Sequence, residues 1–379
     1  MENNQFQKQL QEKISVWLRH GHKSGFIEIE SETVVLSSIL GKRSENQDRM
    51  IFLRVKFEEA SKPSIAVLVL CDGMGGMVSG GNCADIAISS FVAFLVFNNR
   101  NILIDKLKLA VNYANQTVYE NFQGRGGTTL SAVACSDINE WAAVNVGDSR
   151  IYCVRDNGVV EQLTIDDTLE KQLADLNLPS PPPEFKQLLQ FVGMGEGIEP
   201  RNVELKLGSN IRWLLITSDG AHYIPEDTLK PLISHAKSPK EIACRLTNLS
   251  EWLGGTDNSS VAVLDVKKGI FSRNRESNIS SLEIWSVPGK AEFFSLKPMQ
   301  IDVSKNEILD SPKTSTTKTT DIPKQQDIAQ PRKSSKKKAR GDAQKINSVD
   351  GHKPENGEKN SEKPIPKLNI EFSEENQFL

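Results

Sequence analysis

Cysteine and histidine are scarce in this 379-residue sequence, and their scarcity excludes several kinds of site. The five cysteines are widely spaced and form no CxxC pair, which argues against a disulfide framework and a cysteine-based zinc site. The five histidines show no zinc-like spacing either. Most cysteines lie inside apolar segments, where a free thiol behaves as a small hydrophobic group. We therefore expect an intracellular, reducing location, the cytoplasm.

Long apolar runs and an excess of one charge are also missing. We see no stretch that approaches the roughly 18 apolar residues of a membrane helix, and the polar N-terminus lacks the apolar segment of a secretion signal. The 46 basic and 49 acidic residues give a net charge of −3, so the whole chain is not attracted to nucleic acid or anionic membranes. We expect no membrane partner, and nucleic acid is not favoured.

Composition divides the chain into an N-terminal extension, a globular part and a polar tail. Residues 5–20 carry apolar residues at three-to-four spacing, which predicts an amphipathic helix within an extension over residues 1–29. Residues 30–266 alternate strand-like and helical patterns and form the predicted domain. Residues 267–379 form the predicted tail. From residue 295 to 370 it has no aromatic residue and is dominated by Lys, Ser, Thr, Asp and Pro, so we predict disorder because too little apolar surface can be buried.

Within residues 30–266, strands follow strands and helices come in pairs. Strand-like runs are predicted at 33–40, 50–55, 64–71, 129–135, 141–146, 151–154, 211–217 and 260–266, and helices at 82–97, 103–121, 226–234 and 239–252. This order lacks the βαβ alternation of a parallel sheet. It predicts an α+β architecture of mostly antiparallel sheets with helices on the outer faces. Residues 165–200, rich in Pro and Gly, predict an irregular lobe over one edge of the core.

The tail contains three segments of interest. The apolar island at 280–294 could pack back on the domain or bind a partner as a short peptide. The basic run at 331–340 is either a solubilising stretch or a docking site for an acidic partner or nucleic acid. The hydroxyl-rich stretch at 311–320 could be phosphorylated, which would add charge and alter docking.

Four aspartates stand at the ends of strong predicted strands. Asp72 and Asp219 each follow a strand and precede a glycine, Asp148 follows the run WAAVNVG, and Asp257 precedes the strand SVAVLDV. Each one alone is typical of a turn. Strand ends of one core can converge on one edge, however, and hard divalent cations relieve the repulsion between gathered carboxylates. Ligation by carboxylates without histidine suits Mg²⁺ or Mn²⁺.

Arg43 lies five residues before Asp48, on the approach to a predicted strand. An arginine beside a carboxylate–metal cluster indicates an anionic substrate, because the planar guanidinium matches phosphate. The alternative is a solvated loop arginine.

Six short motifs occur in order between residues 33 and 266: RSENQD (43–48), DGMGG (72–76), GGTT (126–129), VGDSRIY (146–152), SDG (218–220) and DNSS (257–260). With them the chain resembles the metal-dependent protein phosphatase family of type 2C, in its compact bacterial form. The resemblance implies an α-β-β-α four-layer sandwich, in which a pair of helices covers each outer face of two antiparallel sheets. This agrees with the layering predicted from the order of strands and helices.

The resemblance also implies how two core Mn²⁺ or Mg²⁺ ions are held. Asp72 would bridge both ions, and the carbonyl of Gly73 would bind the second. Asp219 and Asp257 would complete the protein ligands of the first ion. Asp148 would bind a weaker third ion together with Asp219.

Other implied roles concern water and phosphate. Asp48 would orient metal-bound water, and Arg43 would bind the substrate phosphate. Met74 stands where many eukaryotic members carry a candidate acid histidine, so water would have to protonate the leaving group. His222 could lie near the first ion and assist, or be a buried or surface histidine without a catalytic role.

The implied function is that of a hydrolase acting on phosphoserine and phosphothreonine in proteins, with a role in signalling. Two ions about 4 Å apart would lower the pKa of a bridging water, which would attack phosphorus in line without a phosphoenzyme. A Ser/Thr kinase or its target is the expected phosphoprotein partner, and the tail 267–379 could tether it. Two alternatives stay open: a catalytically silent binding or signalling module of this fold, and a hydrolase of small phosphate esters.

Overall fold

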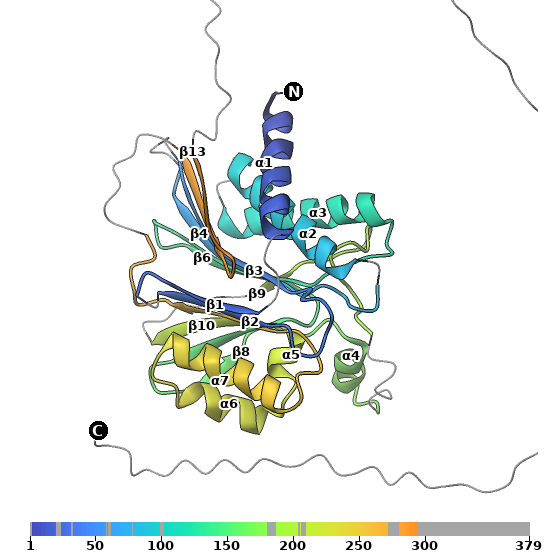
Figure 1. The fold of residues 1–379 in the computed structure, drawn as a ribbon, viewed down its shortest axis with the longest axis vertical. Coiled ribbons are helices and arrows are strands. Elements are labelled where there is room, and N and C mark those ends of the chain that lie inside the picture. The colour runs from blue at the N-terminus through green and yellow to red at the C-terminus, as the bar shows by residue number, and fades with distance from the viewer. Residues whose placement is uncertain are drawn as a thin grey trace, which may run out of the picture. The chain divides into compact units, whose positions relative to one another are not determined.

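Two antiparallel β-sheets face each other, and helices cover the outer surface of each (Figure 1). The computed structural model describes residues 2–19, 24–31, 33–57, 59, 62–77, 79–98, 102–179, 187–203, 205, 210–271 and 280–294. The chain separates into two units, residues 1–299 and 300–379, and every described residue belongs to the first.

The sheets contain six and seven described strands, all paired antiparallel. The six-stranded sheet has the order β1 (Gly25–Ile29), β2 (Val34–Ile39), β11 (Ser259–Asp265), β10 (Ile211–Thr217), β7 (Arg150–Arg155) and β8 (Val160–Gln162). The seven-stranded sheet has the order β13 (Gly289–Phe294), β12 (Ser281–Ser286), β3 (Arg49–Lys56), β4 (Ile65–Cys71), β5 (Leu130–Ser136), β6 (Trp141–Val146) and β9 (Arg201–Val203).

Helices form the two outer layers. The seven-stranded sheet is covered by α1 (Glu2–Arg19), α2 (Gly80–Phe97) and α3 (Leu103–Phe122), and the six-stranded sheet by α5 (Asp219–His222), α6 (Glu226–Ser234) and α7 (Pro239–Trp252). A short helix, α4 (Leu169–Asp175), lies at one side. The structure confirms the predicted α-β-β-α sandwich, with α1 as an additional helix on one face.

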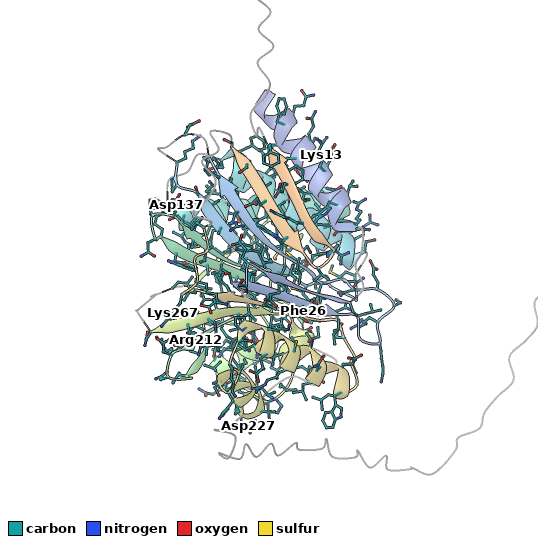
Figure 2. All side chains as sticks on the ribbon, turned by 60° about the vertical axis from the view of Figure 1, so that its left-hand side comes forward. Lys13, Phe26, Asp137, Arg212, Asp227 and Lys267 are labelled. Atoms are coloured by element: carbon teal, nitrogen blue, oxygen red, sulfur yellow. The ribbon has the colours of Figure 1, made fainter. Side chains whose placement is uncertain are left out.

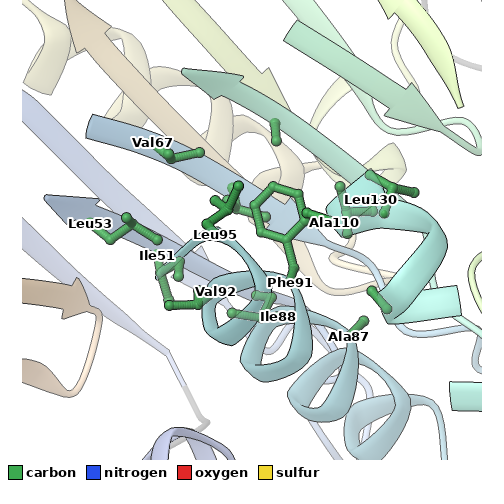
Figure 3. Packing of buried hydrophobic residues seen from close by; sticks show 14 of the residues in the cluster. Ile51, Leu53, Val67, Ala87, Ile88, Phe91, Val92, Leu95, Ala110 and Leu130 are labelled. Atoms are coloured by element: carbon green, nitrogen blue, oxygen red, sulfur yellow. The ribbon is translucent and has the colours of Figure 1, made fainter. Parts of the chain in front are cut away.

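Central strands such as β4 and β11 are mostly apolar because both of their faces are buried. In β3, Ile51 and Leu53 face the helices, whereas Met50 and Phe52 pack in the core between the sheets. Figure 3 shows the core between the seven-stranded sheet and its helices, where Phe91 and neighbouring residues of α2 lie against β3 and β4. Charged side chains such as Lys13, Asp137, Asp227 and Lys267 lie on the outside of the layers (Figure 2).

Helix α2 corrects the expectation that no segment is long and apolar enough to cross a membrane. Its 18 residues, Gly80–Phe97, have a mean hydropathy of 1.6, and 78% of them are buried inside the protein. Their apolarity follows from their position, since α2 packs between the sheet and the helices α1 and α3. The length and composition of α2 are therefore those of a buried core helix.

The hairpin β12–β13 corrects the predicted domain boundary at residue 266. The island at 280–294 packs back on the domain, where β12 pairs with β3 and places Trp285 5.5 Å from the Phe52 ring. Arg54 on β3 also stacks on Trp285 at 4.6 Å and forms an ion pair with Glu283 at 3.2 Å. Residues 295–379, with the runs at 311–320 and 331–340, lie outside the described residues, so the disorder predicted there stays a prediction.

The domain also begins earlier than predicted. Strand β1 starts at Gly25 rather than near residue 30, and the predicted N-terminal amphipathic helix is α1. In the lobe at 165–200, the described residues form α4 and two isolated bridges, Thr168 with Leu188 and Thr128 with Val192. The bridge of Thr128 with Val192 attaches the lobe to the core at the motif GGTT.

Candidate active site

The strand-end aspartates meet at one end of the sandwich. Asp72 follows β4, Asp148 lies in the turn between β6 and β7, and Asp219 and Asp257 flank β10 and β11. Burial raises the pKa of Asp72 well above its ordinary value, and the charges of Asp48, Asp219, Asp148 and Asp257 raise it further. The structure thus places the four other predicted carboxylates, from both sheets, near enough to Asp72 for their charges to act on it.

The other carboxylates show the same crowding. Burial raises the pKa of Asp148 to about 7, with the charge of Asp219 as the next cause. Burial raises the pKa of Asp48 to about 6, although hydrogen bonds from Ser260 and Ser218 oppose the shift. The pKa of Asp219 is raised by burial and then by Asp257. The cluster carries more negative charge than its surroundings compensate.

The donor set suits hydrated divalent cations. The buried Oδ1 atom of Asp48 has no hydrogen-bond partner among the described residues, and carboxylates without histidine favour Mg²⁺ or Mn²⁺. Among those residues, no three His, Cys, Asp or Glu side chains already form a group that could hold an ion. Mg²⁺ is usually bound through one or two carboxylates and keeps several waters, so the cluster fits hydrated ions better than a closed protein cage.

The motif GGTT fixes the backbone of Asp72. The Asp72 N–H donates to Thr129 Oγ1 at 2.9 Å, and the Asp72 carbonyl accepts from Thr129 N at 2.9 Å and from Thr128 Oγ1 at 2.7 Å. A Cβ atom on Gly73 would lie 2.5 Å from the backbone of Gly80, so only glycine fits there. The loop is thereby held close to the start of α2.

Asp48 is oriented from two sides. Its Oδ2 accepts from Ser218 Oγ at 2.9 Å, and the same hydroxyl accepts from the Ser260 N–H at 2.9 Å. Arg49 Nη1 donates to the Asp48 carbonyl at 3.0 Å and is held by a buried ion pair with Asp85 at 2.7 Å. The side chain of Asp48 therefore presents its remaining oxygen, Oδ1, in a fixed direction.

Asn258 fixes the loop that carries Arg43, a role that the sequence did not predict. Its amide donates to the carbonyls of Leu40 at 2.9 Å and Glu45 at 3.1 Å, and its Oδ1 accepts from Gln47 N at 2.8 Å. The residue lies in the motif DNSS, which was the available signal, but its partners are more than 200 residues away.

Arg43 contacts one of the predicted metal ligands. Its Nη2 lies 2.7 Å from Asp257 Oδ2, and its Nε donates to the Thr256 carbonyl at 3.3 Å. The side chains of Arg43 and Asp257 are 45% and 34% exposed. The arginine therefore lies at the open edge of the carboxylate cluster.

Asp167 is a second residue that the sequence did not single out. Its fully buried carboxylate accepts from Gly147 N at 3.0 Å and from Arg201 Nε. The Asp167 N–H donates to the Gly147 carbonyl at 3.0 Å, and the Asp167 carbonyl accepts from Leu189 N at 2.7 Å. Asp167 thus joins the lobe to the turn that carries Asp148.

His222 takes the second of its predicted alternatives, a buried histidine. Its Nδ1 lies 2.8 Å from Thr217 Oγ1, and its ring meets Tyr152 edge-on at 6.5 Å. Burial, followed by the charge of Arg150, lowers the pKa of His222 well below its ordinary value. A neutral, hydrogen-bonded ring has a packing role here.

Known proteins resemble part of this chain in sequence and fold. No protein-family model matches the chain. A putative protein phosphatase 2C-type from Streptococcus pyogenes is 29% identical over 237 residues, which cover 59% of this chain and 92% of the relative. The serine/threonine protein phosphatase PstP of Mycobacterium tuberculosis is 27% identical over 223 residues, covering 56% of this chain but only 43% of PstP.

Solved structures agree with the sequence relatives. The PPM Ser-Thr phosphatase MsPP of Mycobacterium smegmatis, in complex with cacodylate, matches with a TM-score of 0.50 and 27% identity over 61% of this chain and 97% of MsPP. These relatives and structures make the chain similar to metal-dependent protein phosphatases of the PPM or type 2C kind. The catalytic domain of PstP, another phosphatase, was solved with two manganese ions and matches at a TM-score of 0.50 and 27% identity over 61% of this chain and 96% of that domain.

Proposed function

We propose that the protein is a serine/threonine protein phosphatase that uses Mn²⁺ or Mg²⁺ and hydrolyses phosphoserine and phosphothreonine directly with water. The observation that carries this proposal is the meeting of five carboxylates from both sheets beside Arg43, in a chain whose relatives are named protein phosphatases. Excess negative charge at this point suits cations, and the guanidinium suits a phosphoryl group.

In this proposal, Asp72, Asp219 and Asp257 hold the core cations together with the Gly73 carbonyl, and Asp148 serves a weaker third ion. When bound, the cations would lower the pKa of the attacking water and neutralise charge on the phosphoryl oxygens. PstP with two manganese ions supports the choice of ion and the number of core ions.

The chain's own residues then supply orientation. Asp48 Oδ1, buried and without a hydrogen-bond partner in the described structure, is placed to accept a proton from the attacking water. Ser218 fixes the other oxygen of Asp48, which sets the direction of that bond. Arg43 binds the phosphoryl oxygens and stabilises the charge that develops on them.

Direct attack by water is favoured over attack by the one thiol next to Asp72 in the described part of the site. Cys71 adjoins Asp72, but burial, followed by the charge of Asp72, raises the pKa of its thiol well above the ordinary value. The reactive thiolate is therefore disfavoured. His222 is buried, and its ring forms a hydrogen bond with the Thr217 hydroxyl. With Met74 in place of an acid histidine, water supplies the proton to the leaving serine or threonine oxygen.

We also propose that residues beyond the described domain help select the substrate, a Ser/Thr kinase or its target. The sequence support is the basic run at 331–340 and the hydroxyl-rich run at 311–320. Because the hairpin at 281–294 belongs to the domain, a deletion that tests this proposal should begin at residue 295 rather than 267.

Hydrolysis of a phosphothreonine peptide by the purified protein, with and without Mn²⁺, tests the function. We expect metal-dependent turnover that Asp72→Asn and Asp219→Asn abolish and that Asp227→Asn, an exposed control on α6, leaves unchanged. No turnover by folded protein supplied with Mn²⁺ would favour the silent binding module. Equal rates on sugar phosphates and phosphopeptides would favour the small-ester hydrolase.

A further inference from the structure

Both carboxylate oxygens of Asp257 are engaged within the chain. Oδ1 accepts from the Asn258 N–H at 2.8 Å, and Oδ2 accepts from Arg43 Nη2 at 2.7 Å. The Arg43 Nε also donates to the carbonyl of Thr256 at 3.3 Å, so the guanidinium holds Asp257 through two adjacent groups.

The observed pairing conflicts with the two roles proposed for these residues. Asp257 is proposed to bind a cation, and Arg43 is proposed to bind phosphate, yet here they bind each other. A cation at Asp257 would lie beside a guanidinium of the same charge, which is unfavourable even near the surface. A partly exposed pair of this kind contributes a factor of about five at most to an equilibrium, so a bound cation can displace it.

The surrounding contacts allow the side chain to move while its loop stays in place. Asn258 fixes the loop at Leu40, Glu45 and Gln47, and Lys42 N donates to the Gly255 carbonyl at 2.6 Å. A Cβ atom on Gly75 would lie 2.9 Å from Arg43 Nη1, so glycine there leaves space next to the guanidinium. Movement of Arg43 away from Asp257 therefore needs no displacement of the loop contacts made by Asn258.

We propose that Arg43 exchanges between two anionic partners: the Asp257 carboxylate when the cation is absent, and the substrate phosphate when it is present. This inference rests on the proposed function, because it assumes a cation at Asp72, Asp219 and Asp257. Arg43 competes with the cation for Asp257, and the cation frees Arg43 for phosphate. Since coupling between two bound ligands is reciprocal, phosphate that draws Arg43 away also tightens cation binding.

Titration calorimetry of Mn²⁺ into the cation-free protein tests the exchange without measuring activity. Arg43→Met should bind Mn²⁺ more tightly than the wild type by up to about fivefold, because the competing partner of Asp257 is gone. Lys42→Met removes an exposed charge from the same loop and should change the affinity by about twofold or less. Circular dichroism confirms that both variants are folded.

The result that overturns the inference is an Arg43→Met affinity no higher than that of Lys42→Met. An Asp72→Asn control separates this failure from a failure of the proposed function. If the wild type binds Mn²⁺ and Asp72→Asn does not, the cation site stands and only the exchange is wrong. If the wild type shows no binding that depends on Asp72, the proposed function and the exchange both fall.

Discussion

Substitution of Trp285 by alanine would measure how firmly the hairpin β12–β13 belongs to the domain. Trp285 is only 7% exposed, and its ring contacts Phe52 at 5.5 Å, Arg54 at 4.6 Å and Lys290 at 4.7 Å. Truncation of a buried aromatic side chain to alanine costs about 3–5 kcal/mol, and loss of a well-packed ring pair contributes within that range. We therefore expect Trp285→Ala to lower the free energy of unfolding by about 4 kcal/mol.

Urea denaturation followed by circular dichroism would measure this loss. In thermal denaturation, a loss of about 4 kcal/mol corresponds to a fall in Tm of about 8–16 °C for a domain of 150–250 residues. Phe294→Ala is the matched control, because Phe294 belongs to the same hairpin but is 59% exposed; it should change stability by about 0.5 kcal/mol or less. Equal stability of the two variants would refute the reasoning, and residues 281–294 would then be an accessory of the tail.

Four further outcomes follow from the structure. Gly220→Ala should destabilise the protein by about 3 kcal/mol or more in thermal denaturation, because its Cβ would lie 2.0 Å from the Asn258 carbonyl oxygen. His222 is kept neutral by burial, with a pKa well below its unfolded value near 6.5, so its contribution is complete above pH 6.5 and is lost as the pH falls. His222→Asn should therefore flatten the acid limb of stability against pH by up to about 1.4 kcal/mol per pH unit. Asp167→Ala leaves a buried backbone N–H without its acceptor, so we expect a loss of about 1–3 kcal/mol in urea titrations. Deletion of residues 295–379 should leave phosphopeptide hydrolysis unchanged and weaken recovery of the phosphoprotein partner in pulldown.

Each of these outcomes has a matched comparison. Gly269→Ala is the control for Gly220, because an added Cβ there meets no atom within 4 Å; similar losses in both would contradict the steric argument. An acid limb unchanged in His222→Asn would show that other groups set it. Exposed Asp137→Ala should cost less than Asp167→Ala. Unchanged partner recovery after the deletion would disprove tethering by the tail.

The main elements of the fold were predictable because buried strands and helices leave a recognisable pattern of apolar residues in the sequence. Strands buried on both faces read as unbroken apolar runs, and the eight predicted strands and four predicted helices all appear in the structure. The strands β8 and β9, of three residues each, are too short to show a period. In β12, charged Glu283 lies between buried neighbours, and its ion pair with Arg54 could not be foreseen from a local pattern.

The candidate site was predictable where a residue type and a strand end coincide, as for Asp72 and Asp219. Residues that hold others in place were not. Asn258 and Asp167 act through hydrogen bonds to segments about 20 to 220 residues away, so nothing in their immediate neighbours indicates the contact. The pairing of Arg43 with Asp257 also depends on the three-dimensional closeness of two loops separated by 214 positions.

The origin of the carboxylates in both sheets links cation binding to the alignment of the whole sandwich. Asp72 extends from the seven-stranded sheet, whereas Asp219 and Asp257 flank strands of the six-stranded sheet. An ion bound by carboxylates of both sheets would hold the two sheets together at this end of the sandwich. Its binding free energy would then also be folding free energy. If the protein binds manganese as proposed, a shortage of the ion would lower the stability of the pairing between the two sheets as well as the activity.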